Sequence, residues 1–274
     1  MLFRSGIEAD LEVIELMVQA LGRAGASQVR IDLCHMGIVP ALVSTFAEEV
    51  SALGIETESL YALLLAKDLL GLKLLFADHR GPFARACLAL PTLYGPVEAK
   101  SGGDLLDRAR RELPDVGAVR QALDTLEKLC TSPAWARFPG VSLSVDLADL
   151  RGYRYHNGVS FAAYVAGRAD AVGRGGRYDG VGRAFGRSRA ATGFSLELRE
   201  LASMLSAADP DSAIRAPWSD DPAMAACVAA LRAEGQVVIQ ALPGHDDEQQ
   251  EFSCDRELVL RQGRWEISPL SRAS

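Results

Sequence analysis

From residue 149 the chain reads Asp149-Leu-Arg-Gly-Tyr-Arg-Tyr-His156, and it continues through Arg174-Gly-Gly-Arg-Tyr-Asp179 to Ala191-Thr-Gly-Phe-Ser-Leu-Glu-Leu-Arg-Glu200. Apolar runs typical of strands flank each of these three polar clusters. We predict that successive strands bring the clusters together in one pocket. Function then depends on whether this pocket catalyses a reaction or only binds a ligand.

Composition limits the function classes. The sequence has 274 residues, of which 49% are hydrophobic and 24% charged, as in a soluble globular protein with a full core. The net charge is -7, so no overall field favours nucleic acid. Met1–Asp10 is acidic where a signal peptide is apolar, and no apolar run reaches the ~18 residues of a membrane span. We therefore expect a cytoplasmic protein that binds neither nucleic acid nor membrane.

Cysteines and histidines lack the spacing of a metal site or a disulfide framework. No two of the 5 cysteines form a C-x-x-C pair, and most lie in apolar surroundings where cysteine behaves as a small hydrophobe. The 4 histidines show no metal-ligand spacing either. We expect no metal and no cofactor. The residues are Cys34, Cys87, Cys130, Cys227, Cys254, His35, His79, His156 and His245.

Hydrophobic periodicity divides the chain into a core, an insertion and a tail. Residues 1–56 and 132–208 combine helical periodicity with alternating, strand-like segments. Residues 57–131 show only helical periodicity, and residues 209–274 contain one helix, one strand and a hairpin. Because short turns join the core strands, we predict an antiparallel sheet. The predicted class is α+β, with an all-helical insertion and a small C-terminal α/β module.

Arg151 lies at a predicted turn, beside Tyr155 and His156. A guanidinium can hold a carboxylate or phosphate at two points, although a solvated arginine at a turn gives the same sequence pattern. The aromatic neighbours favour a small-molecule pocket. Gly175-Gly176 allows the backbone to approach a ligand closely, and hairpin turns use the same pair.

These clusters resemble the two histidine-recognition signatures of histidyl-tRNA synthetase, a class II aminoacyl-tRNA synthetase. The family signatures read approximately Arg-Gly-Leu-Asp-Tyr-Tyr and Gly-Gly-Arg-Tyr-Asp. This chain has Arg151-Gly-Tyr-Arg-Tyr-His156 and Gly175-Gly-Arg-Tyr-Asp179, with a helical insertion ahead of the first signature, as in the family. The resemblance implies a class II synthetase-like core.

The chain departs from that family where ATP would bind. The third class II motif of the family ends in a glycine-rich strand followed by Glu-Arg. In this chain Glu197 replaces a glycine and Glu200 replaces the arginine. Because an anion repels a polyanionic nucleotide, we expect no adenylation chemistry and no catalytic residues. The first signature also carries Arg154 in place of its aspartate and His156 in place of its second tyrosine.

Three further parts of the synthetase have no counterpart in the sequence. These are motif 1, motif 2 and the anticodon-binding domain, whose place the short tail takes. The chain begins at what resembles the helix after motif 2. We expect either a start codon assigned too late or a true truncation. Self-association is left open, because the family dimerises through motif 1.

The same losses occur in a paralogous family, the regulatory subunits of ATP phosphoribosyltransferase, which the chain is similar to over nearly its full length. The resemblance implies a non-catalytic subunit that forms a hetero-oligomer with the short-form catalytic subunit. That complex carries out the first step of histidine biosynthesis and is inhibited by histidine. The similar segments are Ser5–Val13, His79–Phe83, Leu90–Gly95, Asp149–Tyr153, Arg174–Gly186, Ala191–Ser195 and Gln240–His245.

The resemblance places an effector site for L-histidine in the predicted pocket. Arg151 would hold the carboxylate or the imidazole, and the aromatic residues would contact the ring. Arg177 is equally suited to an internal ion pair with Asp179. Arg174 is a weaker candidate. The expected effector contacts are Arg151, Tyr155, His156, Tyr178 and Arg177.

Two other functions fit the same residues: a degenerate histidyl-tRNA synthetase-like enzyme, and a free-standing histidine-binding protein. Histidine-dependent exchange between ATP and pyrophosphate would identify the enzyme. Co-purification with a short-form catalytic subunit would separate a regulatory subunit from a free-standing sensor. The sequence leaves the stoichiometry and the partner interface open.

Overall fold

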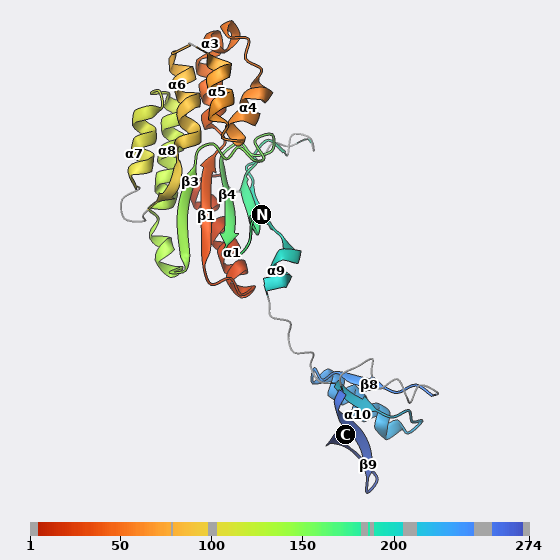
Figure 1. Ribbon diagram of the computed structural model, residues 1–274. Helices are drawn as coiled ribbons and strands as arrows, with labels where there is room; N and C mark the ends of the chain where they lie inside the picture. Colours follow the sequence, from red (N-terminus) through yellow and green to blue (C-terminus); the bar gives the residue numbers. More distant parts are fainter. Residues whose placement is uncertain are drawn as a thin grey trace. The chain divides into compact units, whose positions relative to one another are not determined.

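The computed structural model describes residues 5–77, 79–97, 103–181, 186, 189–204, 213–243 and 254–270. The chain divides into two compact units, Met1–Met204 and Leu205–Ser274. Each unit has its own sheet and its own hydrophobic core (Figure 1). Within the described ranges, no helix combines the length and apolar character needed to cross a membrane.

A six-stranded sheet, here called the large sheet, forms the centre of the first unit, with the order β2-β3-β1-β4-β5-β6. Neighbouring strands are antiparallel, as expected, except that β1 and β3 run parallel. The parallel pair departs from the expectation because the long insertion between these strands serves as a crossover. The strands are β1 (Val29–His35), β2 (Tyr94–Val97), β3 (Val141–Asp146), β4 (Val159–Val165), β5 (Gly173–Arg177) and β6 (Thr192–Leu196).

The two faces of the large sheet differ in chemistry. Val29, Ile31 and Leu33 of β1 are buried on one face, against which α1 (Ile7–Arg23) and α8 (Gly117–Cys130) pack. We call this the helix face. Successive residues of a strand point to opposite sides, so the intervening polar residues lie on the other face, which we call the pocket face.

Helices gather at one end of the large sheet (Figure 1). Most belong to the insertion, and their apolar sides join the same core as the sheet. They are α2 (Ile38–Thr45), α3 (Ala47–Ala52), α4 (Thr57–Leu65), α5 (Leu69–Phe76), α6 (Pro82–Ala89) and α7 (Gly103–Glu112), with short 3₁₀ helices at Leu90–Thr92 and Pro133–Arg137. A further helix, α9 (Leu198–Met204), follows β6.

The expectation that residues 57–131 are helical throughout is wrong at β2. Tyr94-Gly-Pro-Val97 pairs with β3 in antiparallel fashion and forms an edge of the large sheet. Pro96 fits an edge strand, because its missing N–H can face away from the neighbouring strand. The Gly-Pro pair predicts a break in the helices but gives no sign of a strand.

The second unit is a four-stranded sheet with the order β10-β9-β7-β8 and one helix. The predicted helix, strand and hairpin are present, and β7 is a further strand beyond those expected from sequence. Trp265 donates from Nε1 to Asp221 Oδ2 at 2.8 Å and so links the hairpin to the helix N-terminus. The elements are β7 (Ala213–Ala216), α10 (Pro222–Ala233), β8 (Val238–Gln240), β9 (Cys254–Arg261) and β10 (Arg264–Pro269). His245, the last residue of the family-like segment Gln240–His245, lies outside the described residues.

A buried ion pair joins α1 to the large sheet. Arg177 of β5 donates from its terminal nitrogen to Asp10 Oδ1 at 2.8 Å and from Nε to Asp10 Oδ2 at 3.1 Å. The two side chains are only 11% and 4% exposed. Arg177 also bonds to the carbonyl of Gly6 and to Asp179, which confirms the expected Asp179 pair. Burial raises the pKa of Asp10, and the hydrogen bonds from Arg177 oppose that rise.

Replacing Arg177 with methionine should destabilise the first unit by about 3–5 kcal/mol at neutral pH, because Asp10 would remain buried without its cation. The loss should shrink as pH falls through the raised pKa of Asp10, since the protonated carboxyl no longer needs a partner. Urea unfolding across pH measures both effects. Arg137→Met is the control, because Arg137 is 61% exposed in its pair with Glu15 and should cost at most about 1 kcal/mol. Equal losses in both variants would contradict the prediction.

Gly175→Ala should destabilise the first unit by about 1–3 kcal/mol through overpacking. An added Cβ would lie 2.4 Å from Phe161 Cζ and 2.4 Å from the carbonyl oxygen of Gly193. Gly22→Ala is the matched control, because nothing lies within 4 Å of its Cβ position on the exposed side of α1. That change should be neutral or stabilise by up to about 1 kcal/mol. Urea midpoints compare the two, and an unchanged midpoint for Gly175→Ala would refute the packing argument.

Candidate functional site

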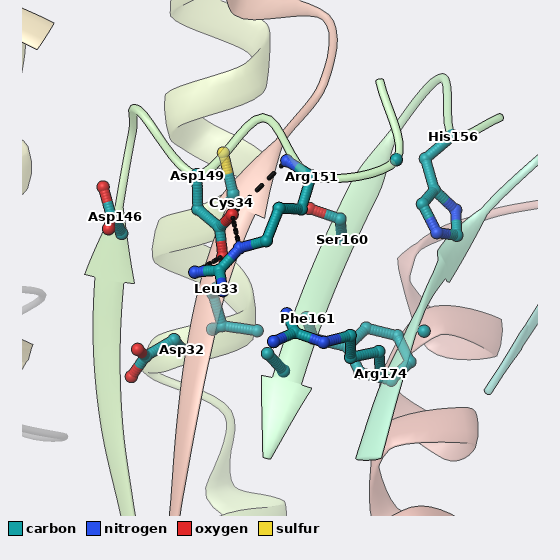
Figure 2. A pocket seen from close by; sticks show the side chains of 13 residues that line it. Asp32, Leu33, Cys34, Asp146, Asp149, Arg151, His156, Ser160, Phe161 and Arg174 are labelled. Atoms are coloured by element: carbon teal, nitrogen blue, oxygen red, sulfur yellow. Dashed lines mark hydrogen bonds and ion pairs between the residues drawn. The ribbon is translucent and has the colours of Figure 1, made fainter. Parts of the chain in front are cut away.

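A cavity of about 230 Å³ opens on the pocket face of the large sheet, over β1, β4 and β5 (Figure 2). Strand register places Asp32, Ala162 and Arg174 directly opposite one another across these three strands. We call these residues the charged row. The central residue, Ala162, contributes only a methyl group. The floor of the cavity is therefore low between the Asp32 carboxylate and the Arg174 guanidinium.

A second row of small side chains lies one step along the same strands. Cys34, Ser160 and Gly176 are opposed in register, two residues from the members of the charged row, and therefore share its face. We call them the small row. Burial raises the pKa of Cys34, so its thiol stays neutral. Position 176 has space only for glycine, because a Cβ there would lie 2.8 Å from His156 Nδ1.

Arg151 lines the cavity from the turn after β3, but its charge is already paired. Its Nε donates to Asp149 Oδ1 at 2.7 Å, and a terminal nitrogen donates to Asp149 Oδ2 at 3.2 Å. The same nitrogen donates to the Tyr164 hydroxyl at 3.4 Å. Hydrogen bonding to Asp149 raises the pKa of Arg151. Figure 2 shows Arg151 and Asp149 joined by this two-point pair.

Arg174 enters the cavity from β5 and differs from Arg151 in its partners. Across the described ranges of the chain it makes no hydrogen bond or ion pair. Figure 2 shows its guanidinium extending from β5 over β4. Arg174 therefore presents to the cavity a guanidinium whose donors are unused among the described residues, although the sequence ranks it below Arg151.

Two further carboxylates line the cavity, and each has a cation beside it. Asp146 accepts a salt bridge from Lys67 at 2.7 Å and the N–H of Ala148 at 3.1 Å. Asp32 pairs with Arg30 at 2.9 Å. Neither aspartate is among the site residues expected from sequence, although the alternation of apolar and polar residues along β1 and β3 could have placed both on the pocket face.

Three aromatic rings cluster beside the cavity. The centroids of Tyr155 and Tyr178 lie 4.8 Å apart, and those of Tyr155 and His156 lie 5.0 Å apart. His156 lines the cavity itself, whereas Tyr178 is 7% exposed and Tyr155 is 49% exposed. Burial lowers the pKa of His156, and among the described residues its Nδ1 is a buried polar atom without a hydrogen-bond partner. The cluster is thus a neutral aromatic wall with one exposed ring.

Arg177 is not part of the cavity wall. It lies on the helix face, where it bonds to Asp10, so the sheet separates it from the charged row. The structure thus brings Arg151 and His156 to the cavity, places Tyr155 and Tyr178 beside it, and assigns Arg177 to the core. Sequence spacing places Arg174 and Arg177 in one motif, but their odd separation puts them on opposite faces.

A second cavity, of about 560 Å³, lies next to the first and shares Arg174 with it. Its other charged residues include Asp170, Glu197 and Glu200. Glu200 forms an ion pair with Arg168 at 3.0 Å. Glu197 and Glu200, the two glutamates expected from sequence to stand in place of family residues for ATP, therefore line one polar space adjoining the first cavity.

Comparison with known proteins assigns the two units to two family descriptions. The family model for histidyl-tRNA synthetase matches residues 2–201. The family model for the ATP phosphoribosyltransferase subunit HisZ C-terminal domain matches residues 211–268. The boundary between the matches falls in the same region as the division between the units.

Curated relatives match nearly the whole chain. The ATP phosphoribosyltransferase regulatory subunit of Cupriavidus pinatubonensis is 49% identical over 265 residues, which cover 97% of this chain and 65% of the relative. The corresponding subunit of Burkholderia vietnamiensis is 50% identical over 266 residues, with the same shares covered. The chain therefore spans slightly less than two thirds of the length of these relatives.

Solved structures share the fold, and one of them combines both family names. A protein of Bacillus halodurans described as an ATP phosphoribosyltransferase regulatory subunit/histidyl-tRNA synthetase matches with a TM-score of 0.68 and 25% identity, covering 89% of this chain and 62% of that one. A chain of the ATP phosphoribosyl transferase (HisG:HisZ) complex of Thermotoga maritima matches with a TM-score of 0.51 and 19% identity, covering 70% and 62%. With its core matched by the synthetase family model from residue 2 to residue 201, the chain belongs to the histidyl-tRNA synthetase family.

Proposed function

We propose that the chain is a non-catalytic regulatory subunit of ATP phosphoribosyltransferase, which forms a hetero-oligomer with the short-form catalytic subunit in the first step of histidine biosynthesis. Its similarity to regulatory subunits over 97% of its length supports this assignment. So does the match of its second unit to the HisZ C-terminal domain. The structural likeness to a chain of the Thermotoga complex is consistent with a partner-binding protein.

The observation that carries the non-catalytic part of the proposal is the charge of the second cavity. The carboxylates of Asp170, Glu197 and Glu200 outnumber the two guanidiniums that line it. Those belong to Arg174 and to Arg168, which is paired to Glu200 at 3.0 Å. A triphosphate would meet carboxylates where the synthetase family provides glycine and arginine. Like charges in such a space disfavour the nucleotide. The first cavity, by contrast, keeps the groups that suit an amino acid.

We further propose that L-histidine binds in the first cavity as the effector. The aromatic wall offers the Tyr155 ring, 49% exposed, for stacking against an imidazole, and burial keeps His156 neutral beside it. Arg151, fixed by Asp149, would form the rim. Histidine would shift the complex between states only by binding one state more tightly than the other.

A cytoplasmic location is part of the proposal. All five cysteines are free thiols, and Cys34, Cys87 and Cys130 are buried. Unpaired, buried cysteines are typical of a reducing compartment.

Addition of this chain to a purified short-form catalytic subunit should raise the rate of ATP phosphoribosylation, and the two proteins should co-elute in size-exclusion chromatography. Excess L-histidine should lower the rate of the complex. The chain alone should show no histidine-dependent exchange between ATP and pyrophosphate. Exchange activity would support a degenerate synthetase instead. Histidine binding without co-elution or activation would support a free-standing sensor.

Tyr155→Ala should weaken L-histidine binding about 3- to 10-fold, because a stacked aromatic contact contributes about 0.5–1.5 kcal/mol. Titration calorimetry on the full chain measures the change. Trp218→Ala is the control, because Trp218 is an aromatic residue of similar exposure, 54%, in the second unit. Equal affinities for the wild type and Tyr155→Ala would remove the aromatic wall from the proposed site.

A further inference from the structure

We propose that the charged row is a clamp for an α-amino acid zwitterion, in which Arg174 binds the carboxylate and Asp32 binds the ammonium group. This inference rests on the proposed histidine site and deepens it. It moves the carboxylate contact from Arg151, the residue expected from sequence, to Arg174.

Register gives the clamp its geometry. Asp32 is opposite Ala162, and Ala162 is opposite Arg174, so the two charged residues stand two strands apart on one face. Strand spacing puts their Cα atoms about 10 Å apart. Both side chains point to the same side, and only a methyl group lies between them. A small ligand lying on Ala162 would therefore have a carboxylate on one side and a guanidinium on the other.

Arg174 and Arg151 differ in how many of their hydrogen-bond donors are already used. Arg151 already uses Nε and a terminal nitrogen on the two oxygens of Asp149, at 2.7 and 3.2 Å. Contacting a ligand carboxylate would place that anion beside Asp149, which is repulsive. Arg174 has no bond within the described part of the chain, and all of its donors are open to a two-point contact.

Among the carboxylates of the cavity, Asp32 is the one best able to accept further hydrogen bonds from a ligand. Asp149 accepts from Arg151 at both oxygens and from the Arg151 N–H. Asp146 accepts from Lys67 and from a backbone N–H. Asp32 also accepts at both oxygens, at 2.9 and 3.4 Å, but among the described residues only from Arg30, whose side chain is 54% exposed and lies outside the cavity lining. A carboxylate has about four acceptor positions, so Asp32 retains capacity for an ammonium donor.

The rest of the cavity fits the remaining part of the ligand. The small row lies beside the charged row, and two of its members, Cys34 and Ser160, line the cavity with their small side chains. His156 stands over Gly176 at the end of that row, next to Tyr155. The ligand's side chain would extend along the small row toward this wall, which suits an aromatic or imidazole group.

The test combines two variants with three ligands in titration calorimetry on the full chain. The ligands are L-histidine, histamine, which lacks the carboxylate, and 3-(imidazol-4-yl)propionate, which lacks the amine. Arg174→Gln should weaken L-histidine and the propionate about 10- to 100-fold and leave histamine within about threefold, because only ligands with a carboxylate lose a charged contact. Asp32→Asn should weaken L-histidine and histamine and leave the propionate unchanged.

Matched controls separate the clamp from general damage. Arg137→Gln and Asp115→Asn remove exposed charges of the same types, 61% and 82% exposed, and should change no affinity. Arg174→Lys keeps the charge and should restore part of the L-histidine affinity. Melting temperatures establish that each variant is folded.

Three results would overturn the clamp alone. Arg174→Gln could weaken all three ligands equally, which would make Arg174 structural. Arg151→Gln, rather than Arg174→Gln, could remove the preference for ligands with a carboxylate. Unchanged L-histidine affinity in both clamp variants would also refute it, while leaving histidine binding by the chain intact. If the wild type binds no L-histidine, the proposed effector site fails together with the clamp.

Discussion

The buried pair between Arg177 and Asp10 is the constraint on which the site depends. It fastens α1 beneath β5, with side chains 11% and 4% exposed. A buried cation and anion are tolerable only together, so the pair fixes the relative position of helix and strand. Arg174 lies three residues earlier on β5, on the opposite face. The ion pair that holds Arg177 against α1 therefore also directs Arg174 into the cavity, because it fixes which face of β5 points toward the helix.

The large sheet separates two kinds of chemistry. Its helix face is largely apolar around that pair, and its pocket face carries charged and small side chains over a cavity of about 230 Å³. Within the cavity, Arg151 and Asp149 neutralise each other, whereas Arg174 stays open. The adjacent cavity holds Glu197 and Glu200. Charge thus favours a small zwitterion in one space and disfavours a nucleotide in the other.

Much of the first unit could be predicted from periodicity. The alternation along β1 and β3 predicts strands with one apolar face, and the helices of the insertion follow from their spacing. The strand β2 could not be predicted, because Tyr94-Gly-Pro-Val97 becomes a strand only through its pairing with β3. The parallel pairing of β1 and β3 could not be predicted for a similar reason. It depends on where the chain re-enters the sheet after the long insertion.

The sequence by itself determined the family signatures, the acidic replacements at Glu197 and Glu200, and the presence of Arg151, His156 and the two tyrosines near one pocket. Only the tertiary structure decided which arginine is available. Arg151 and Arg174 offer the same guanidinium in sequence, but one lies against Asp149 and the other has no partner among the described residues. Arg177 shares a motif with Arg174 yet faces α1. Sequence gives each residue its chemistry, whereas register and packing decide which charges are already compensated.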